Sequence, residues 1–115
     1  MLRLKVDEPW LSEIISGRKT IEGRSGSRDK FSPYIGTVAE FYSYKQTCQV
    51  YIIDVKHYPT IDEYLFQSGW KNVAPHEKSL ESTRAAYYGF YDKDGDPEDL
   101  IRQKGGYCAI IIKMM

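Results

Sequence analysis

The sequence has few cysteines, no surplus of charge of either sign and few histidines. Its two cysteines, Cys48 and Cys108, lie far apart in the chain, which argues against a disulfide scaffold. With only two histidines, the sequence shows no zinc-ligand spacing. Sixteen basic residues balance sixteen acidic ones, which argues against a strong nonspecific binder of nucleic acid. We therefore expect free thiols, no metal and no cofactor.

The sequence also lacks long apolar runs. Charged residues interrupt each apolar stretch before it is long enough to span a membrane. The start of the chain shows no signal-peptide pattern, because apolar and charged residues alternate over residues 2–6. We expect one soluble domain over residues 1–115, without membrane contact. We expect it to be intracellular, in the cytoplasm with the nucleus left open. The oligomeric state is also left open.

What the sequence does have is a series of short strands and short helices. Alternation of apolar and polar residues predicts strands at 2–6, 19–24, 37–44, 48–57 and 107–113. The last of these is apolar throughout its middle, which predicts a central strand. Residues 25–36 are predicted to be a loop, and residues 92–99 an acidic turn.

Three helices are predicted between these strands. Pro9 and Gly17 are typical of the start and end of a helix over residues 8–16. Thr60 begins a capping box, and Ser79 begins another helix. The candidate buried positions of that last helix are Leu80, Ala86, Tyr87 and Phe90. A chain that is mostly strand, with two to three short helices packed on one side, is predicted to have an α+β fold. Its centre would be a small closed or half-closed β-barrel of about five to six strands.

One octapeptide concentrates residues that could carry chemistry. It runs from residue 17 to 24 as Gly-Arg-Lys-Thr-Ile-Glu-Gly-Arg. In a strand, Glu22 and Arg24 lie on one face, and Lys19 at the helix–strand junction can turn toward the same cleft. Arg offers a planar fork, Lys a point charge and Glu an acceptor for an exocyclic amine, which suits a phosphate and a base edge. The alternative is an ion pair that only ties the loop to the barrel.

The residues around the octapeptide carry a local surplus of positive charge. Between residues 17 and 30, five residues are basic and two are acidic, which would attract an anion. Arg18 and Ser25 are candidate ligand-binding residues in this stretch. We expect Arg28 and Lys30 to be solvated charges of the loop.

The octapeptide resembles the signature Gly-x-Lys-x-x-Glu-x-Arg of the ASCH domain family, whose members are PUA-like β-barrels. Residues 69–75, the aromatic helix end at 87–91 and the Gly-Gly-Tyr of 105–107 resemble the same family. The resemblance implies a PUA-like barrel with a cleft beside the signature. It also implies a module that binds RNA or a modified nucleoside or nucleotide, in a cleft lined by the signature's Lys, Glu and Arg.

The resemblance carries an enzymatic alternative as well. Some bacterial ASCH proteins are amidohydrolases that remove the acetyl group of acetylated cytidine, and one has been proposed to be a ribonuclease. In the amidohydrolases the signature Lys activates the nucleophile, a Thr stands two residues before the Arg, and a downstream Glu completes the set. Here Lys19 is kept, Glu22 stands in the Thr position, and the downstream Glu matches loosely onto His76 or Glu77. A small hydrolase would use Lys19, Glu22 and Glu77, with Glu22 as a base toward water.

Trp10 and His76 complete the candidate ligand-binding residues. Trp10, on the helix beside the signature, could stack on a base, and its alternative role is core packing. His76 is suited to proton transfer near neutral pH, and its alternative role is that of a polar residue at a helix start. A different function altogether is an adaptor that binds protein through an aromatic surface. The sequence leaves open whether the chain is an enzyme.

Overall fold

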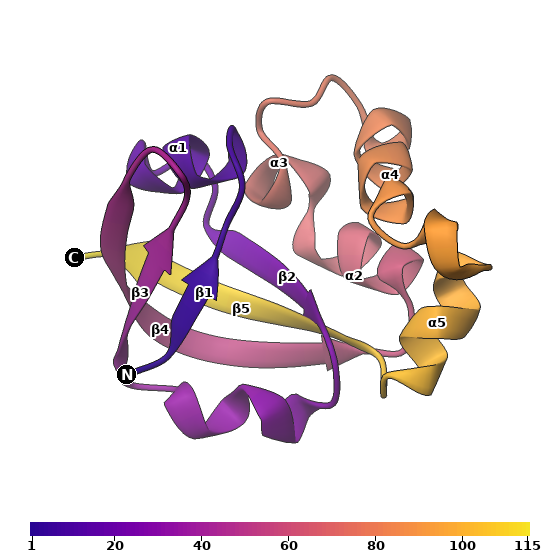
Figure 1. The fold of residues 1–115 in the computed structure, drawn as a ribbon, viewed down its shortest axis with the longest axis horizontal. Helices are drawn as coiled ribbons and strands as arrows, with labels where there is room; N and C mark the ends of the chain where they lie inside the picture. Colours follow the sequence, from indigo (N-terminus) through magenta and orange to yellow (C-terminus); the bar gives the residue numbers. More distant parts are fainter.

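The chain forms one curled sheet of five strands with helices packed against it (Figure 1). The computed structural model describes residues 1–115, apart from the side chain of Asp94. The strands are β1 (Arg3–Lys5), β2 (Ile21–Ser25), β3 (Val38–Tyr42), β4 (Thr47–Tyr58) and β5 (Tyr107–Met114). The α-helices are α1 (Trp10–Ile15), α2 (Ile61–Ser68), α3 (Trp70–Val73), α4 (Leu80–Gly89) and α5 (Pro97–Gln103). Short 3-10 helices are η1 (Arg28–Lys30), η2 (Ser32–Tyr34) and η3 (Asp92–Asp94).

The sheet is an open half-barrel. Its strand order is β1-β3-β4-β5-β2, with β1 parallel to β3 and the other neighbours antiparallel. The curl brings the two edge strands, β1 and β2, to face each other across an opening (Figure 1). The guanidinium of Arg24 on β2 donates a hydrogen bond to the backbone carbonyl of Lys5 on β1. The α+β class is confirmed, and the barrel is open.

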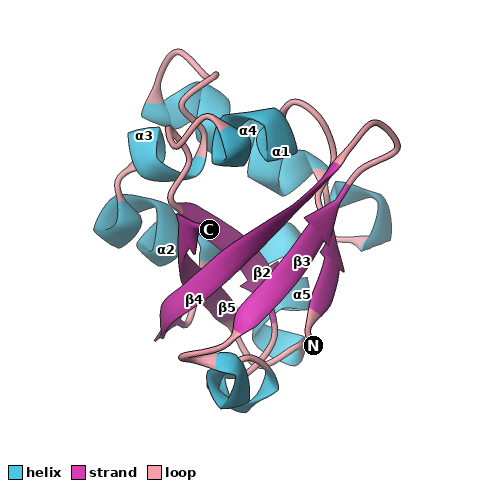
Figure 2. Ribbon diagram, turned by 90° about the vertical axis from the view of Figure 1, so that its left-hand side faces the viewer, coloured by secondary structure: helices cyan, strands magenta, loops and turns pink.

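Strand β5 is buried on both faces, as its apolar run predicts. Cys108, Ile110 and Ile112 belong to a core cluster inside the curl of the sheet. Tyr107 and Ala109 belong to a second cluster, between the sheet and the helices. The strand lies between β4 and β2, so the prediction of a central strand is confirmed. In Figure 2, α1 to α4 lie together along one side of the strands.

The described residues contain more helix than the two to three predicted segments. Helix α3 follows Gly69, which has a φ of 82° and separates it from α2. Helix α5 was also missed, and the prediction of a turn over residues 92–99 is wrong in its second half. Asp96 caps α5 by accepting from the amides of Glu98 and Asp99, and Pro97 occupies the first turn. This Asp-Pro pair is a helix-start signal that was present in the sequence.

Two burial predictions for α4 are wrong. Leu80 is 37% exposed and Phe90 is 55% exposed, whereas Tyr87 is buried as expected and Ala86 is half-buried. The helix packs through Thr83 and Tyr87, four residues apart on one face, so the ends of the predicted stripe face solvent. No helix in the part of the chain that the structure describes is long and apolar enough to cross a membrane.

Candidate functional site

Lys19 lies at the junction between α1 and β2 and is buried. Helix α1 ends at Ile15, and Gly17, two residues later, has a φ of 85° where the chain leaves the helix. The Lys19 side chain is 1% exposed, and its Nζ donates to the carbonyls of Ile21 at 2.5 Å and Val73 at 2.7 Å. Oε1 of Glu22 lies 3.4 Å from the same Nζ. Two of the three N–H donors of the ammonium thus bind backbone carbonyls, and its charge is paired with Glu22.

The buried ammonium is electrostatically balanced by its neighbours. Burial lowers the pKa of Lys19 from its ordinary value of 10.5, and the Glu22 carboxylate opposes that shift. The ring of Trp10 lies 5.2 Å from Nζ, which places the positive charge close to an aromatic surface. Lys19 is therefore held inside the protein and does not face solvent.

Glu22 lies between two cations. Its side chain is largely buried, and Oε2 accepts from Nε of Arg24 at 2.9 Å while Lys19 approaches Oε1. Arg24 is part-exposed, and it joins Glu22 to the carbonyl of Lys5 across the sheet opening. Period-two alternation places Glu22 and Arg24 on one face of β2, and the structure brings all three signature side chains together.

A hollow of about 220 Å³ lies beside Glu22 and Arg24, and we call it the signature hollow. Lys19 does not line it, contrary to the expectation of a cleft lined by all three, because its side chain is buried behind Glu22. The lining residues of the hollow are Lys5, Val6, Asp7, Trp10, Glu22, Gly23, Arg24, Tyr87, Phe90, Tyr91 and Tyr107. The lining therefore combines side chains from β1, α1, β2, α4 and β5. It contains two bases, two acids and an aromatic wall, so it suits a planar, partly polar ligand.

Gly23 forms part of the hollow because nothing larger fits there. A Cβ atom at this position would lie 2.5 Å from Oη of Tyr64 and 2.7 Å from Cε2 of Tyr107. The strand thus presses its backbone directly against the tyrosine rings. The sequence shows this glycine, but only the packing of α2 and β5 on β2 shows why it is needed.

The aromatic wall is held together by edge-to-face contacts. The ring centroid of Trp10 lies 4.5 Å from that of His76, 5.5 Å from Tyr87 and 5.9 Å from Phe90. The Tyr87 hydroxyl is hydrogen-bonded to that of Tyr64 at 3.0 Å, and burial raises the pKa of Tyr87 well above its ordinary value. The tyrosine is therefore a neutral wall residue rather than an acid or base at physiological pH.

The remaining sequence candidates lie around the signature hollow without lining it. Arg18 is exposed and forms an ion pair with Glu13 at 2.8 Å. Ser25 lines a different hollow. His76 contacts the Trp10 ring from outside the hollow, and its Nε2 lies 3.8 Å from Oε2 of Glu77. Nδ1 of His76 is buried and has no hydrogen-bond partner among the described residues.

The described side chains offer no group of three or more His, Cys, Asp or Glu residues arranged to hold a metal ion. The hollow is also lined by Lys5, Asp7 and Tyr107, to which no sequence pattern points. They come from β1, its following loop and β5. No local pattern could have found them, because the curl of the sheet brings these segments beside β2.

A curled sheet that carries this charged signature where the first helix meets β2 is the architecture of one known class of domain. The family model of the ASCH domain matches residues 4–104, and the chain belongs to the ASCH domain family. The chain is similar to the crystal structure of hypothetical protein PH0355, with 26% identity and a TM-score of 0.80. That match covers 99% of this chain and 98% of the other.

The fold is shared with a second solved structure. The solution NMR structure of protein PF0455 from Pyrococcus furiosus has 24% identity and a TM-score of 0.68. The match covers 99% of this chain and 96% of the other. At this identity the similarity shows a shared fold alone. No curated protein matches the sequence.

Proposed function

We propose that this ASCH domain binds one nucleoside or nucleotide unit of RNA in the signature hollow. The observation that carries the proposal is a largely buried carboxylate, Glu22, held between Lys19 and Arg24 beside a wall of aromatic rings. A carboxylate has about four lone-pair sites, so the two cations leave acceptor capacity for a ligand. Carboxylates accept from the exocyclic amine of cytosine in this way.

The size of the hollow favours a single unit. At about 220 Å³ it lies below the roughly 300–1,000 Å³ typical of sites for drug-sized ligands. A base would contact Trp10, Tyr87 and Phe90, and base–aromatic stacking contributes about 1–3 kcal/mol per base. Lys5 and Arg24 also line the hollow and would attract a phosphate through their positive charges, although Nε and Nη2 of Arg24 already bond Glu22 and the Lys5 carbonyl.

Calorimetric titration with the four ribonucleoside 5′-monophosphates tests this proposal. Glu22→Gln keeps the shape but weakens the acceptor, and loss of a charged hydrogen bond weakens binding by about tenfold or more. Glu81→Gln is the matched control, since Glu81 is exposed on α4 and outside the hollow. If a folded Glu22→Gln variant binds as tightly as the wild type, the proposal is wrong.

The second candidate function is a small hydrolase that acts on an acylated nucleoside or on RNA. The observation that favours it is the 3.4 Å approach of a buried lysine to a carboxylate at a hollow. Lys19 is buried and held by two backbone carbonyls, so Lys19 would position Glu22, and Glu22 would act as the base toward water. Glu77 lies beside His76 and outside the hollow, which argues against it as a third catalytic group.

Incubation with acetylated cytidine or a short RNA, followed by chromatography, separates the two candidates. A hydrolase forms product with the wild type and with Glu81→Gln but not with Glu22→Gln. Nucleotide binding by the wild type without any product rejects the hydrolase on these substrates and leaves the binding module.

A further inference from the structure

We propose that a second hollow beside the first is the subsite for the adjacent nucleotide of a single RNA strand. This inference rests on the proposed function of the signature hollow. The second hollow has a volume of about 440 Å³. Its lining residues are Leu2, Leu4, Arg24, Ser25, Lys30, Phe31, Tyr34 and Tyr91. We call it the loop hollow, because half of its lining belongs to the segment from Ser25 to Tyr34.

The two hollows are neighbours along the opening of the half-barrel. Arg24 and Tyr91 line both of them. Arg24 crosses the opening to the carbonyl of Lys5, so one guanidinium lies at the boundary between the two spaces. The segment with η1 and η2 runs along the lower side of the molecule in Figure 1, between the end of β2 and the start of β3. A strand that leaves the signature hollow past Arg24 therefore enters the loop hollow.

The charge of the loop hollow differs from that of the signature hollow. Its described lining contains two basic residues, Arg24 and Lys30, and no acidic residue, whereas the signature hollow has two of each sign. An excess of positive charge in a concave surface attracts phosphate. Because Arg24 is also paired with Glu22, the unpaired charge here is that of Lys30, and the phosphate that links two nucleotides would lie beside Lys30 at the Arg24 boundary.

Lys30 is exposed, as expected of a loop residue, but its side chain is held over the end of β2. A Cβ atom added at Gly26 would lie 2.8 Å from Cδ of Lys30, so the lysine side chain passes close over the Gly26 backbone. Its Nζ lies 3.5 Å from the carbonyl of Ser25 and 5.3 Å from the centre of the Phe31 ring. Among the described residues Lys30 forms no ion pair, so its charge is available to a ligand.

Aromatic rings complete the loop hollow. Phe31 is buried at its base, and Tyr34 and Tyr91 are half-buried at its sides. Half-buried tyrosines give a flat apolar face to a base while the hydroxyl stays in water. Sequence-tolerant stacking of this kind is how single-stranded nucleic acid is bound. A base and a phosphate are thus both accommodated beside the first site.

The test compares ribonucleotides of one and two units, with fluorescently labelled mono- and dinucleotides of each base. The wild type is expected to bind the better dinucleotides about tenfold more tightly than the mononucleotides, since one more base stacks. The variant Lys30→Ala/Tyr34→Ala should lose this gain and bind mononucleotides within about twofold of the wild type, because neither residue lines the first hollow.

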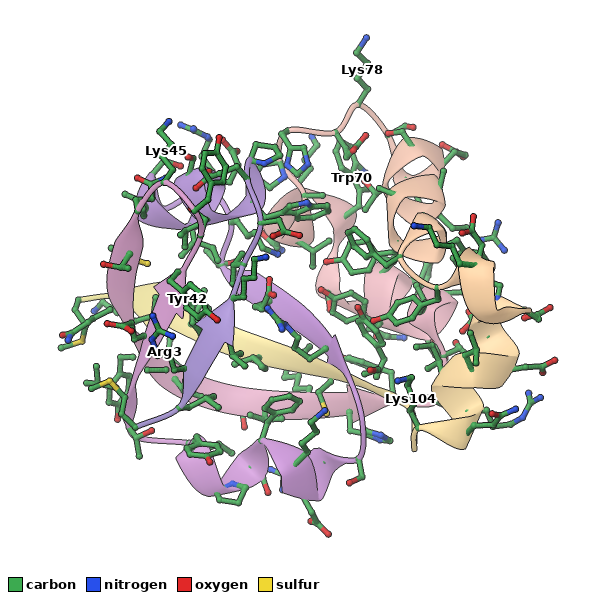
Figure 3. The ribbon with its side chains drawn as sticks, viewed as in Figure 1. Arg3, Tyr42, Lys45, Trp70, Lys78 and Lys104 are labelled. Atoms are coloured by element: carbon green, nitrogen blue, oxygen red, sulfur yellow. The ribbon has the colours of Figure 1, made fainter. Side chains whose placement is uncertain are left out.

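The matched control is Lys78→Ala/Tyr44→Ala, which removes the same residue types elsewhere. Lys78 projects away from the body of the molecule (Figure 3), and Tyr44 is 88% exposed. Because Tyr34→Ala removes a half-buried ring, thermal unfolding of each variant is measured, and Lys30→Glu alone serves as a second variant. Loss of one phosphate contact should lower the slope of log affinity against log salt by about 0.7.

The outcomes separate this inference from the function on which it rests. If dinucleotides still bind more tightly than mononucleotides in both Lys30 variants, the second subsite is overturned and the first is not. The same holds if the wild type binds mononucleotides but binds dinucleotides no more tightly. A gain that depends on Lys30 but not on Glu22 supports the loop hollow and overturns the proposed function of the signature hollow. An absence of nucleotide binding at any length overturns both.

Discussion

The Nζ atom of Lys19 lies 3.4 Å from Oε1 of Glu22, and both side chains are buried where α1 passes into β2. Lys19 lies before the first residue of β2 and Glu22 lies within β2, so strict alternation along a strand does not apply between them. Removing Lys19 would leave Glu22 with Arg24 as its one remaining cation and would leave the buried carbonyls of Ile21 and Val73 without their donor. The pair therefore fixes the position of the Glu22 carboxylate beside the signature hollow.

Lys19→Met should destabilise the fold strongly. The substitution removes one of the two cations of Glu22 and leaves the carbonyls of Ile21 and Val73 without their donor, and each buried group left unsatisfied costs about 1–3 kcal/mol. Unfolding by urea, followed by circular dichroism, measures the change. The control Lys56→Met, at an exposed position on β4, should lie within about 0.5 kcal/mol of the wild type. A Lys19→Met variant as stable as this control would contradict the pairing.

Gly23→Ala should destabilise the protein and reduce nucleotide binding, because its Cβ would overlap the Tyr64 and Tyr107 rings. Overpacking of this kind costs about 1–3 kcal/mol. Gly89→Ala is the opposite control, since nothing lies within 4 Å of its Cβ and it is the last residue of α4. Alanine stabilises a helix by up to about 1 kcal/mol relative to glycine, so the melting temperature of Gly89→Ala should be higher than that of the wild type. Equal melting temperatures for the two variants would refute the packing account.

Arg24→Lys should weaken nucleotide binding by about tenfold, because a lysine cannot hold Glu22 and the Lys5 carbonyl with one planar fork. Calorimetric titration of the best-bound nucleotide measures the loss. Arg102→Lys, whose parent side chain is 73% exposed on α5, should bind like the wild type. Unchanged affinity in Arg24→Lys would show that the charge of residue 24 is sufficient without its fork geometry.

The acid side of the stability profile should depend on Glu8. Burial raises the pKa of this carboxyl, but hydrogen bonds from Ser12, Ser43 and Gln46 outweigh that and lower it to about 2 from 4.5. A carboxyl whose pKa is depressed by folding contributes stability above its unfolded value. That contribution is lost as the pH falls from about 4.5 to about 2.

Glu8→Gln should therefore be less stable than the wild type at pH 7, and the difference should shrink as the pH falls toward 2. Urea unfolding at a series of pH values measures it. Glu81 is exposed, so the free energy of unfolding of Glu81→Gln should change with pH in the same way as that of the wild type. A difference between Glu8→Gln and the wild type that is the same at pH 7 and pH 3 would show that ionisation of Glu8 plays no part.

Local sequence patterns predict much of the fold. The alternation in residues 2–6 and 37–44 reflects half-buried strands, and the apolar run of β5 reflects burial on both faces. The Asp96–Pro97 start of α5 is an equally local signal, but it stands within a run of acidic and turn residues that also predicts a loop. The exposed ends of α4 could not be predicted, because the helix meets its neighbours over only one turn of the apolar stripe.

The sequence by itself determined the composition of the signature and which of its side chains share a face of β2. Strand geometry alone decides that, since residues two apart point the same way. Only the tertiary structure decided what the trio faces. The pairing of β2 with β5 brings Tyr107 to the hollow, and the curl of the sheet brings Lys5 and Asp7 to it. These neighbours are set by pairing between strands far apart in the chain, and no local period encodes that pairing.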